Sequence, residues 1–416
     1  MNIYDSASRV LPVESRLNKV VAIPATNARQ VTTYTHDTTP PVFVSSSLNM
    51  NTGVLVLVFD ETVRATTVVP TRITIHERST VASSSAVRTL IGGTVTLVDS
   101  TSITVALTWD DMNVIKNFGI LAVDRGSSHV TLANAALADM VGNNIVQSTL
   151  MVASGTADTT EPTVTNFDLD LTREVLTLEF SETVNGSTFD VTGLTIQNAP
   201  TASLSRTLTN GVFTKIHNTK FELKMDISDL NYIKSVLGLA KSSSNTYLTS
   251  EYGFILDMST NHVVAINDGA AKSVRTYTAD MVRPNLISFS LDMDLALLSL
   301  TFDETVHAPV NPDQLSIQTS RSLTLSEHSV TLSSTCPSSA VFSTVVNVTI
   351  VLGDMNRLKY FDDVASRISN TFVVITANFV HDMNNNQVVL RPTTNALANV
   401  LFFSDVTRHW LLPFPS

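Results

Sequence analysis

Short apolar runs with a period of two recur along the whole chain, rich in valine, isoleucine, leucine and threonine. The clearest are residues 54–59, 175–180 and 297–302, and the first third of the chain adds 42–44, 73–75, 94–97, 103–107, 130–132 and 145–146. A period of two places successive side chains on opposite faces, as in a β-strand. Turn residues separate the runs, and about seven to eight strands in roughly 120 residues are typical of a β-sandwich. The pattern therefore predicts an all-β fold.

The chain also repeats itself, at spacings of 121, 122 and 125 residues. Five landmarks occur in the same order in three copies, which indicates tandem domains of one kind. The first landmark is a joint segment that starts at Asp37, Asp158 and Asp280 and returns in a less similar form at Asp405, and the second is an apolar strand. The third is a glutamate at the end of that strand (Glu61, Glu182, Glu304), and the fourth is an Asp-x-Asn-x-x-Lys segment that starts at Asp111, Asp229 and Asp354. The fifth is a closing pair (Asp139/Asn143, Asp257/Asn261, Asp382/Asn386).

These landmarks define the expected domains. Residues 1–36 are predicted to be the C-terminal part of a preceding repeat, 37–157, 158–279 and 280–404 to be three immunoglobulin-like repeats, and 405–416 to be the first strand of a following repeat. The chain is therefore expected to be an interior segment of a longer protein. The joints leave little room for flexible linker, and Pro41, Pro162 and Pro284 stiffen them. We expect tandem immunoglobulin-like β-sandwich domains arranged as an elongated rod.

One helical turn is expected in each copy, within the Asp-x-Asn-x-x-Lys segment. Asp110, Ser228 and Gly353 are acceptable N-cap residues, and the isoleucine or leucine that follows should point inward. The segment has two interpretations, a binding surface or a capped turn whose aspartate is favoured by the helix N-terminus. The sequence favours the capped turn.

Acidic residues recur at three positions of the repeat and are candidate calcium ligands. Calcium prefers six to eight oxygen ligands from carboxylates, amides and backbone carbonyls. A closing pair, a joint aspartate and a strand-end glutamate could supply several of them at one domain joint. The predicted set is Glu61, Asp139, Asn143, Asp158, Glu182, Asp257, Asn261, Asp280, Glu304, Asp382 and Asn386, with Asp37 as the first joint aspartate.

A simpler interpretation stays open for these acids. Asp and Asn are ordinary residues of turns, and a glutamate after a strand is often solvated. The dense Asp-x-Asp-x-Asp spacing of a dedicated calcium loop is absent from the sequence. Calcium and turn formation are therefore both kept as explanations.

Composition narrows the possible functions. The net charge of −11 argues against binding to a phosphate backbone, and no apolar run has the length of a membrane span. The single cysteine, Cys336, cannot form an internal disulfide. No nucleophile elbow, phosphate-binding loop or histidine zinc spacing is present. The paired acids Asp60 and Glu61 could suggest glycoside hydrolysis, but the second copy has Ser181 in place of the first acid, so no catalytic residues and no enzyme are predicted.

The joint segment, the strand that ends in glutamate and the closing Asp-x-x-x-Asn resemble a known group of sequences. They are similar to tandem immunoglobulin-like repeats, of bacterial surface-layer, adhesin or cadherin-like type, in giant extracellular proteins of algae and protists. The resemblance implies an extracellular or cell-surface location, flagellar surfaces included. It also implies calcium at some joints, and N-glycans if the chain is secreted by a eukaryote, for which Asn185 and Asn347 are the sequons.

Two functions follow as hypotheses. The first is a non-enzymatic structural protein that forms a stalk or filament, such as a flagellar hair (mastigoneme), with neighbouring repeats or copies of the same protein as partners. The alternative is a cell-adhesion or carbohydrate-binding module that recognises glycans or surface proteins through loops. Residues 64–90, 185–210 and 307–345 differ most among the copies and would be those loops.

Overall fold

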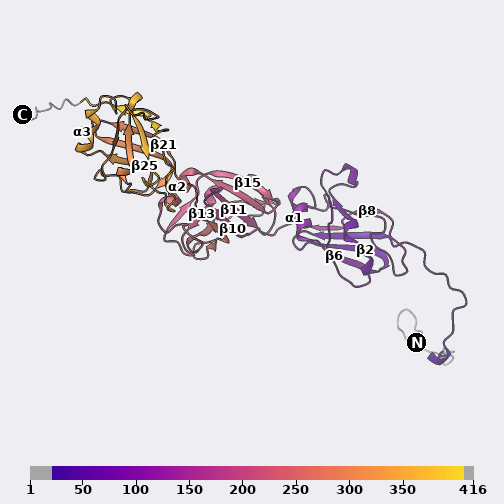
Figure 1. Cartoon of the computed structure of the whole chain (residues 1–416). Coiled ribbons are helices and arrows are strands. Elements are labelled where there is room, and N and C mark those ends of the chain that lie inside the picture. The colour runs from indigo at the N-terminus through magenta and orange to yellow at the C-terminus, as the bar shows by residue number, and fades with distance from the viewer. Residues whose placement is uncertain (1–20, 407–416) are drawn as a thin grey trace, which may run out of the picture.

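The computed structural model describes residues 21–406. Three β-sandwiches follow one another in a row, and the chain runs from the first to the third without turning back (Figure 1). Helix α1 (Trp109–Asn117) lies at the joint between the first and second sandwiches, and α2 (Ile227–Ser235) lies at the joint between the second and third (Figure 1). Helix α3 (Leu352–Tyr360) belongs to the third sandwich. The predicted all-β fold is confirmed, and the overall shape is elongated.

The first sandwich has a sheet in the order β5-β6-β2-β1-β9 and a second sheet in the order β4-β3-β7-β8. Its strands are β1 (Phe43–Asn49), β2 (Val54–Val63), β3 (Ile73–His76), β4 (Val87–Thr89), β5 (Thr94–Val95), β6 (Ser100–Ala106), β7 (His129–Leu132), β8 (Ser148–Met151) and β9 (Ser154–Thr156).

The second sandwich repeats this plan, with sheets in the orders β15-β16-β11-β10-β20 and β14-β13-β17-β19 and a small β12-β18 pair. Its strands are β10 (Val164–Asp170), β11 (Val175–Phe180), β12 (Val184–Asn185), β13 (Leu194–Gln197), β14 (Ser205–Thr207), β15 (Gly211–His217), β16 (Lys220–Met225), β17 (Tyr247–Ser250), β18 (Leu256–Asp257), β19 (Lys272–Ser273) and β20 (Thr276–Thr278).

The third sandwich has sheets in the orders β25-β22-β21-β28 and β24-β23-β26-β27. Its strands are β21 (Leu286–Asp292), β22 (Leu297–Val306), β23 (Leu315–Gln318), β24 (Ser329–Thr331), β25 (Ser343–Thr349), β26 (Phe372–Ile375), β27 (Leu397–Ala398) and β28 (Leu401–Phe403).

The same hairpin opens each sandwich. β1 pairs antiparallel with β2, β10 with β11 and β21 with β22, and each pair has a bulge at the same place in the register. The residue before the second strand has a positive φ in all three hairpins: Gly53 at 66°, Glu174 at 60° and Ala296 at 54°. Only the first copy uses glycine, which adopts this conformation without strain. A short last strand, β9, β20 or β28, then pairs in parallel with the first strand.

Each sandwich has its own hydrophobic core. The three clusters of buried residues run from Phe43 to Val152, from Val164 to Val274 and from Leu286 to Val388. Alternate residues of β2 are buried, as the period of two predicts. Burial of these apolar side chains stabilises each sandwich without a disulfide, since Cys336 is free and buried.

Several local predictions were wrong. Residues 145–146 form no strand, and residues 94–97 contribute only Thr94–Val95. In the second sandwich, the apolar residues 261–266 make only isolated bridges at His262 and Ile266, and β19 and β20 follow later. Short apolar segments of this kind fit a buried loop as well as a strand, so their pattern does not decide between them.

The helices also begin earlier than predicted. They start at Trp109, Ile227 and Leu352, so Asp110, Ser228 and Gly353 are not N-caps. The N-caps are Thr108, Asp226 and Val351, of which the first two accept a backbone hydrogen bond through their side chains. The inward-pointing residues Ile115, Ile233 and Leu358 are fully buried, as predicted.

The ends of the chain are described only in part. Of the segment predicted to close a preceding repeat, residues 1–20 lie outside the described residues, and residues 21–36 are exposed. Of the predicted following strand, residues 407–416 lie outside the described residues.

Candidate functional site

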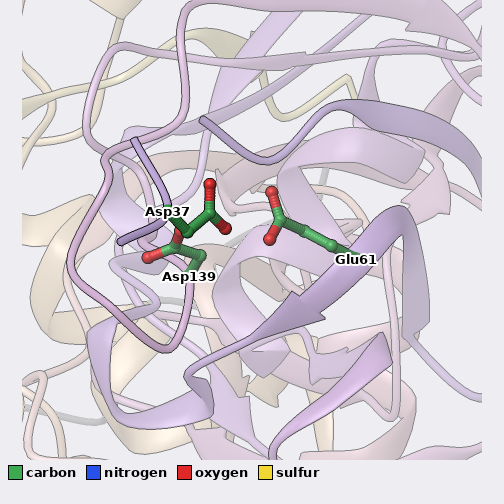
Figure 2. Close-up of side chains that lie close together, drawn as sticks. All are labelled: Asp37, Glu61 and Asp139. Carbon is green, nitrogen blue, oxygen red and sulfur yellow. The ribbon is translucent and has the colours of Figure 1, made fainter. Parts of the chain in front are cut away.

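Three groups of acidic side chains form, one at the end of each sandwich where the chain enters it. We call them the first triad (Asp37, Glu61, Asp139), the second triad (Asp158, Glu182, Asp257) and the third triad (Asp280, Glu304, Asp382). In each, one carboxylate oxygen per residue lies within 4.8 Å of the others. Figure 2 shows the three side chains of the first triad close together, with the Glu61 carboxylate turned toward Asp37. The structure therefore brings together the acids that the repeat pattern singled out.

Each triad is assembled from three segments of one sandwich. The glutamate lies at or just beyond the end of the second strand, for example Glu61 in β2. The closing aspartate is placed against it by a bridge between strands: Val63 pairs with Asp139, Val184 with Asp257 and Val306 with Asp382. The joint aspartate arrives with the chain that enters the sandwich. The fold of one repeat thus makes the same acidic centre three times.

The closing asparagine fixes the closing aspartate. In the first triad, Asp139 Oδ1 accepts hydrogen bonds from the backbone N–H groups of Val141, Gly142 and Asn143, and Asn143 Nδ2 donates to Asp139 Oδ2 at 2.8 Å. The same side-chain bond joins Asn261 to Asp257 and Asn386 to Asp382.

The amide nitrogen of each asparagine also donates to the backbone carbonyl of the joint aspartate. The donor–acceptor distance is 3.3 Å for Asn143 and Asp37, 3.3 Å for Asn261 and Asp158, and 2.9 Å for Asn386 and Asp280. In this arrangement the asparagines position two of the acids, and they face the triads with nitrogen rather than with a ligand oxygen.

A lysine from the preceding sandwich lies in the second and third triads. Lys116, in α1, pairs with Asp158 at 2.9 Å and also with Glu182. Lys234, in α2, pairs with Asp280 and Glu304, both at 2.6 Å. The side chain of Lys234 is only 5% exposed. A buried ammonium group with two carboxylate partners therefore connects each sandwich to the next.

The electrostatics of these joints follow from burial and from the excess of acids. Burial lowers the pKa of Lys116, but hydrogen bonds and attraction from Glu182 and Asp158 outweigh it, so the pKa is raised. The pKa of Lys234 is raised in the same way, since hydrogen bonds and attraction from Asp280 and Glu304 outweigh burial. Burial and the neighbouring carboxylates raise the pKa of Glu182 and of Glu304 to about 7, against the attraction of the lysine. Three buried carboxylates and one ammonium thus favour a bound proton near neutral pH.

The asparagine of the same helix makes a second contact across each joint. Asn113 Oδ1 accepts from the backbone N–H of Thr183 at 2.7 Å, and the Thr183 hydroxyl donates to the backbone carbonyl of Asn113 at 2.9 Å. Asn231 and Thr305 repeat both bonds at 3.0 and 3.2 Å. Two specific contacts, from Asn and Lys of one helix face, therefore fix the next sandwich.

The aspartate of the helical segment lies in the first helical turn, as expected, and has a second role. Asp111, Asp229 and Asp354 are buried, and each accepts a hydrogen bond from the backbone of its own sandwich, at Ile91, Thr209 and Ser333. The segment is therefore a helix, as the sequence favoured, and it is also a contact surface for the next sandwich.

Further polar contacts support the joints. Trp109 Nε1 donates to the Ser181 carbonyl at 3.1 Å, and Asn51 Oδ1 accepts from the backbone N–H of Thr159 at 2.7 Å. At the next joint, the Thr172 hydroxyl donates to the Ala279 carbonyl at 2.8 Å. The exposed Trp109 also borders a shallow groove together with Glu179, His217 and Lys220 of the second sandwich.

The first triad differs from the other two in its surroundings. Among the described residues, none of its carboxylates has an ion-pair partner. Asp37 is exposed and Glu61 is half-buried, whereas all the acids of the second and third triads are buried. Burial and the charges of Asp37 and Asp139 raise the pKa of Glu61. This triad has no cation beside it within residues 21–406.

Of the two sequons, Asn185 lies beside the second triad, since it pairs with Leu256 next to Asp257, whereas Asn347 is on another strand of the third sandwich. Asn347 is exposed on β25, an edge strand, and Asn185 precedes a short turn in which its side chain accepts from Ser187. Cys336 is buried, and its Sγ lies 3.3 Å from Asp354 Oδ2. Glycosylation stays a prediction.

Comparison with known proteins finds only solved structures of low similarity. No known protein family and no curated protein matches the chain. It is similar to the FN1–FN3 domains of chicken CNTN1, at 8% identity over 86% of this chain and 99% of that chain, with a TM-score of 0.25.

Two repeat proteins show the same level of likeness. The S-layer protein rSbsC(31-844) is 10% identical over 81% of this chain and 52% of that chain, with a TM-score of 0.20. A tetra-tandem repeat in the extending region of a large adhesion protein is 17% identical over 86% of this chain and 74% of that chain, with a TM-score of 0.17. With scores this low, the assignment of tandem β-sandwiches rests on the strands and sheets themselves.

The joint lysines were missed by sequence reasoning, although a signal was present. Lys116, Lys234 and Lys359 recur at one position, directly after the buried isoleucine or leucine of the helix. A lysine that recurs as regularly as three acids of opposite charge is a candidate for their partner.

Proposed function

We propose that the chain is a non-enzymatic structural rod, an interior segment of a long extracellular repeat protein that forms a stalk or filament. The observation that supports it most directly is the identical construction of the two described joints. Both combine a buried lysine, two carboxylates and an Asn–Thr hydrogen-bond pair. A joint built the same way twice repeats one angle between neighbours and extends the chain in a defined direction.

The joints are suited to stiffness. Lys116 and Lys234 are held by charge-assisted hydrogen bonds in surroundings with little water, where such bonds are strong and directional. Rotation of one sandwich against the next would separate buried charges, which is costly. This favours a spacer over a flexible string of domains.

The proposed location is extracellular or at the cell surface, with a flagellar hair as one specific form of the filament. None of the helices among the described residues is long and apolar enough to cross a membrane. The exposed sequon at Asn347 would accept a glycan in such a location. The partners would be neighbouring repeats or copies of the same protein.

Small-angle scattering and negative-stain microscopy of the chain test the proposal. We expect a straight particle with three lobes and a narrow distribution of joint angles. Lys116→Met with Lys234→Met should broaden that distribution, while Lys224→Met, which removes only an exposed ion pair on β16, should not. A wild-type chain that is as variable in angle as the joint variant would disprove the stiff rod.

Adhesion or glycan binding is the second candidate, and the groove at Trp109 is the observation that favours it. An exposed indole beside Glu179 and Lys220 offers a flat apolar face with polar groups around it. A glycan array with the wild type and Trp109→Ala tests this function. Binding that is lost in the variant would support it, and the absence of any glycan signal would remove it.

Calcium at the joints stays a prediction. The ammonium groups of Lys116 and Lys234 lie against the carboxylates that would bind the ion. A metal ion and a lysine would therefore compete for each of these two triads.

A further inference from the structure

The first triad has the parts of a joint but lacks a partner helix among the described residues. Thr62 stands where Thr183 and Thr305 stand in the other sandwiches. It is exposed, whereas Thr183 and Thr305 are buried under the asparagine of the preceding helix. The surface around Asp37, Glu61 and Thr62 thus matches two surfaces that are covered elsewhere in the same molecule.

Helix α3 carries the complementary surface. Asn356 and Lys359 occupy the positions of Asn113 and Lys116, and both are exposed. Lys359 Nζ lies 2.5 Å from Asp405 Oδ2, and Asp405 stands where the joint aspartates Asp158 and Asp280 stand. Lys359 therefore forms one of the two ion pairs of a joint, the one with the joint aspartate, as the two buried lysines do.

We propose that the first triad binds the α3 helix of a second copy of this chain, so that copies join head to tail. Lys359 of one copy would pair with Glu61 of the next, as Lys116 and Lys234 pair with Glu182 and Glu304, and Asn356 would accept from the backbone N–H of Thr62. The inference rests on the proposed structural function: in a longer chain the helix of a preceding repeat would occupy the first triad, and between separate chains α3 of a second copy takes that place. It extends it by naming the two surfaces that make the contact.

The two described joints are the second, independent indication of this ligand. The same acids, in the same arrangement, bind a lysine ammonium at the second and third triads. Asp405 of the arriving copy and Asp37 of the receiving copy occupy equivalent positions. Because Asp37 lies in the exposed segment 21–39, either aspartate can complete the triad while the other turns to solvent.

A lysine also fits the charges at both ends. The three acids of the first triad repel one another, and this repulsion, with burial, raises the pKa of Glu61. An arriving ammonium group relieves the repulsion and becomes desolvated together with the acids. While the two chains are separate, these charges are exposed, so added salt should screen their attraction and weaken the association.

Sedimentation velocity of the chain over a range of concentrations tests the proposal. We expect self-association at low ionic strength that gives dimers and longer species. Lys359→Gln and Glu61→Gln should each weaken it on the order of tenfold or more. Lys224→Gln is the matched control, because this lysine is exposed on β16 and distant from both surfaces. The Lys224→Gln chain should associate as strongly as the wild type. Circular dichroism confirms that each variant is folded.

Charge exchange makes the test specific. Lys359→Glu chains and Glu61→Lys chains should each stay monomeric when alone, since both pair like charges. An equal mixture should associate again, because each kind of chain then offers the complement of the other.

The outcomes separate this inference from the proposed function. Wild-type chains that stay monomeric at every concentration, or variants that associate like the wild type, would overturn the inference. Heat of binding from calcium chloride that disappears in Glu61→Gln, without self-association, would do the same by showing a metal site. Straight particles that do not associate would leave the rod intact, whereas variable joint angles would remove the rod itself.

Discussion

Asn113 and Thr183 lie 70 residues apart in the chain and are joined by a hydrogen bond of 2.7 Å from the Thr183 backbone N–H to the Asn113 side-chain oxygen. Both residues are buried, and they belong to different sandwiches. An equivalent bond joins Asn231 to Thr305. The joint is therefore a specific interface, and its parts can be tested one at a time.

Asn113→Ala should loosen the first joint. The variant leaves the buried N–H of Thr183 without its partner, which costs about 1–3 kcal/mol. Hydrogen exchange at Thr183 should become faster by a factor on the order of ten or more, while the core strands of both sandwiches keep their protection. Asn347→Ala, on the exposed edge of the third sandwich, is the control and should leave Thr183 unchanged. Equal exchange in Asn113→Ala and the wild type would contradict the role assigned to this bond.

Lys234→Met should destabilise the joint between the second and third sandwiches at neutral pH. It leaves the buried Asp280 and Glu304 without their ion-pair partner, and loss of one partner of a buried ion pair typically costs about 3–5 kcal/mol. Scanning calorimetry should show a lower melting temperature for the third sandwich.

The control for this variant is Lys224→Met, which removes an exposed ion pair with Glu174 and should change stability by less than about 1 kcal/mol. If the two variants melt alike, the buried lysine does not stabilise the joint.

The pH dependence of stability has a defined sign. In the folded chain the pKa values of Glu182 and Glu304 are about 7, above their ordinary value, because of burial and nearby carboxylates. The folded state therefore binds protons that the unfolded state releases, and stability falls as the pH rises through the ordinary pKa toward 7. One pKa unit corresponds to about 1.4 kcal/mol, so the effect is bounded at about 3 kcal/mol per glutamate.

Melting curves between pH 5 and pH 8 measure this effect, with Glu182→Gln and Glu304→Gln for comparison. Burial lowers the pKa of His76, so its contribution to stability changes with pH in the opposite direction. The difference between the wild type and the double variant removes its contribution. A difference that does not change with pH would contradict the raised pKa values.

Calcium should stabilise the third triad only when Lys234 has been removed. In the wild type, Lys234 competes with the ion for the third triad, so its melting transition should be the same in millimolar calcium and in chelator. In Lys234→Met the three acids stay within reach of one ion, and calcium should raise the melting temperature. Lys234→Met with Glu304→Gln and Asp382→Asn is the control without a site. Stabilisation of the wild-type joint by calcium would instead show that the ion displaces the lysine.

Much of the fold could be predicted because the repeat shows each strand three times. The runs 54–59, 175–180 and 297–302 all form central strands, since each run is long enough for its period of two to define a buried face. Residues 145–146 were misassigned because two apolar residues fit a buried loop equally well. The helix starts were misplaced because Thr108 and Asp226, the true caps, lie just before the segment that repeats.

The candidate site was predicted in part. That the acids of one repeat would gather followed from their order along the chain, because closing, joint and strand-end residues meet at one end of a sandwich. That Lys116 would lie between Asp158 and Glu182 depends on where α1 projects beyond its own sandwich. This is a tertiary relationship between two domains, and no local pattern contains it.

The parallel pairing of the first and last strands within a sandwich has a consequence for tension. In the first sandwich β1 and β9 run side by side in the same direction, and Ser47, Leu48 and Asn49 lie opposite Ser154, Gly155 and Thr156. A pull on the two ends of this sandwich is directed along both strands in opposite senses. Their hydrogen bonds are then loaded together in shear rather than opened one after another, so the geometry suits a molecule that must resist drag without extending.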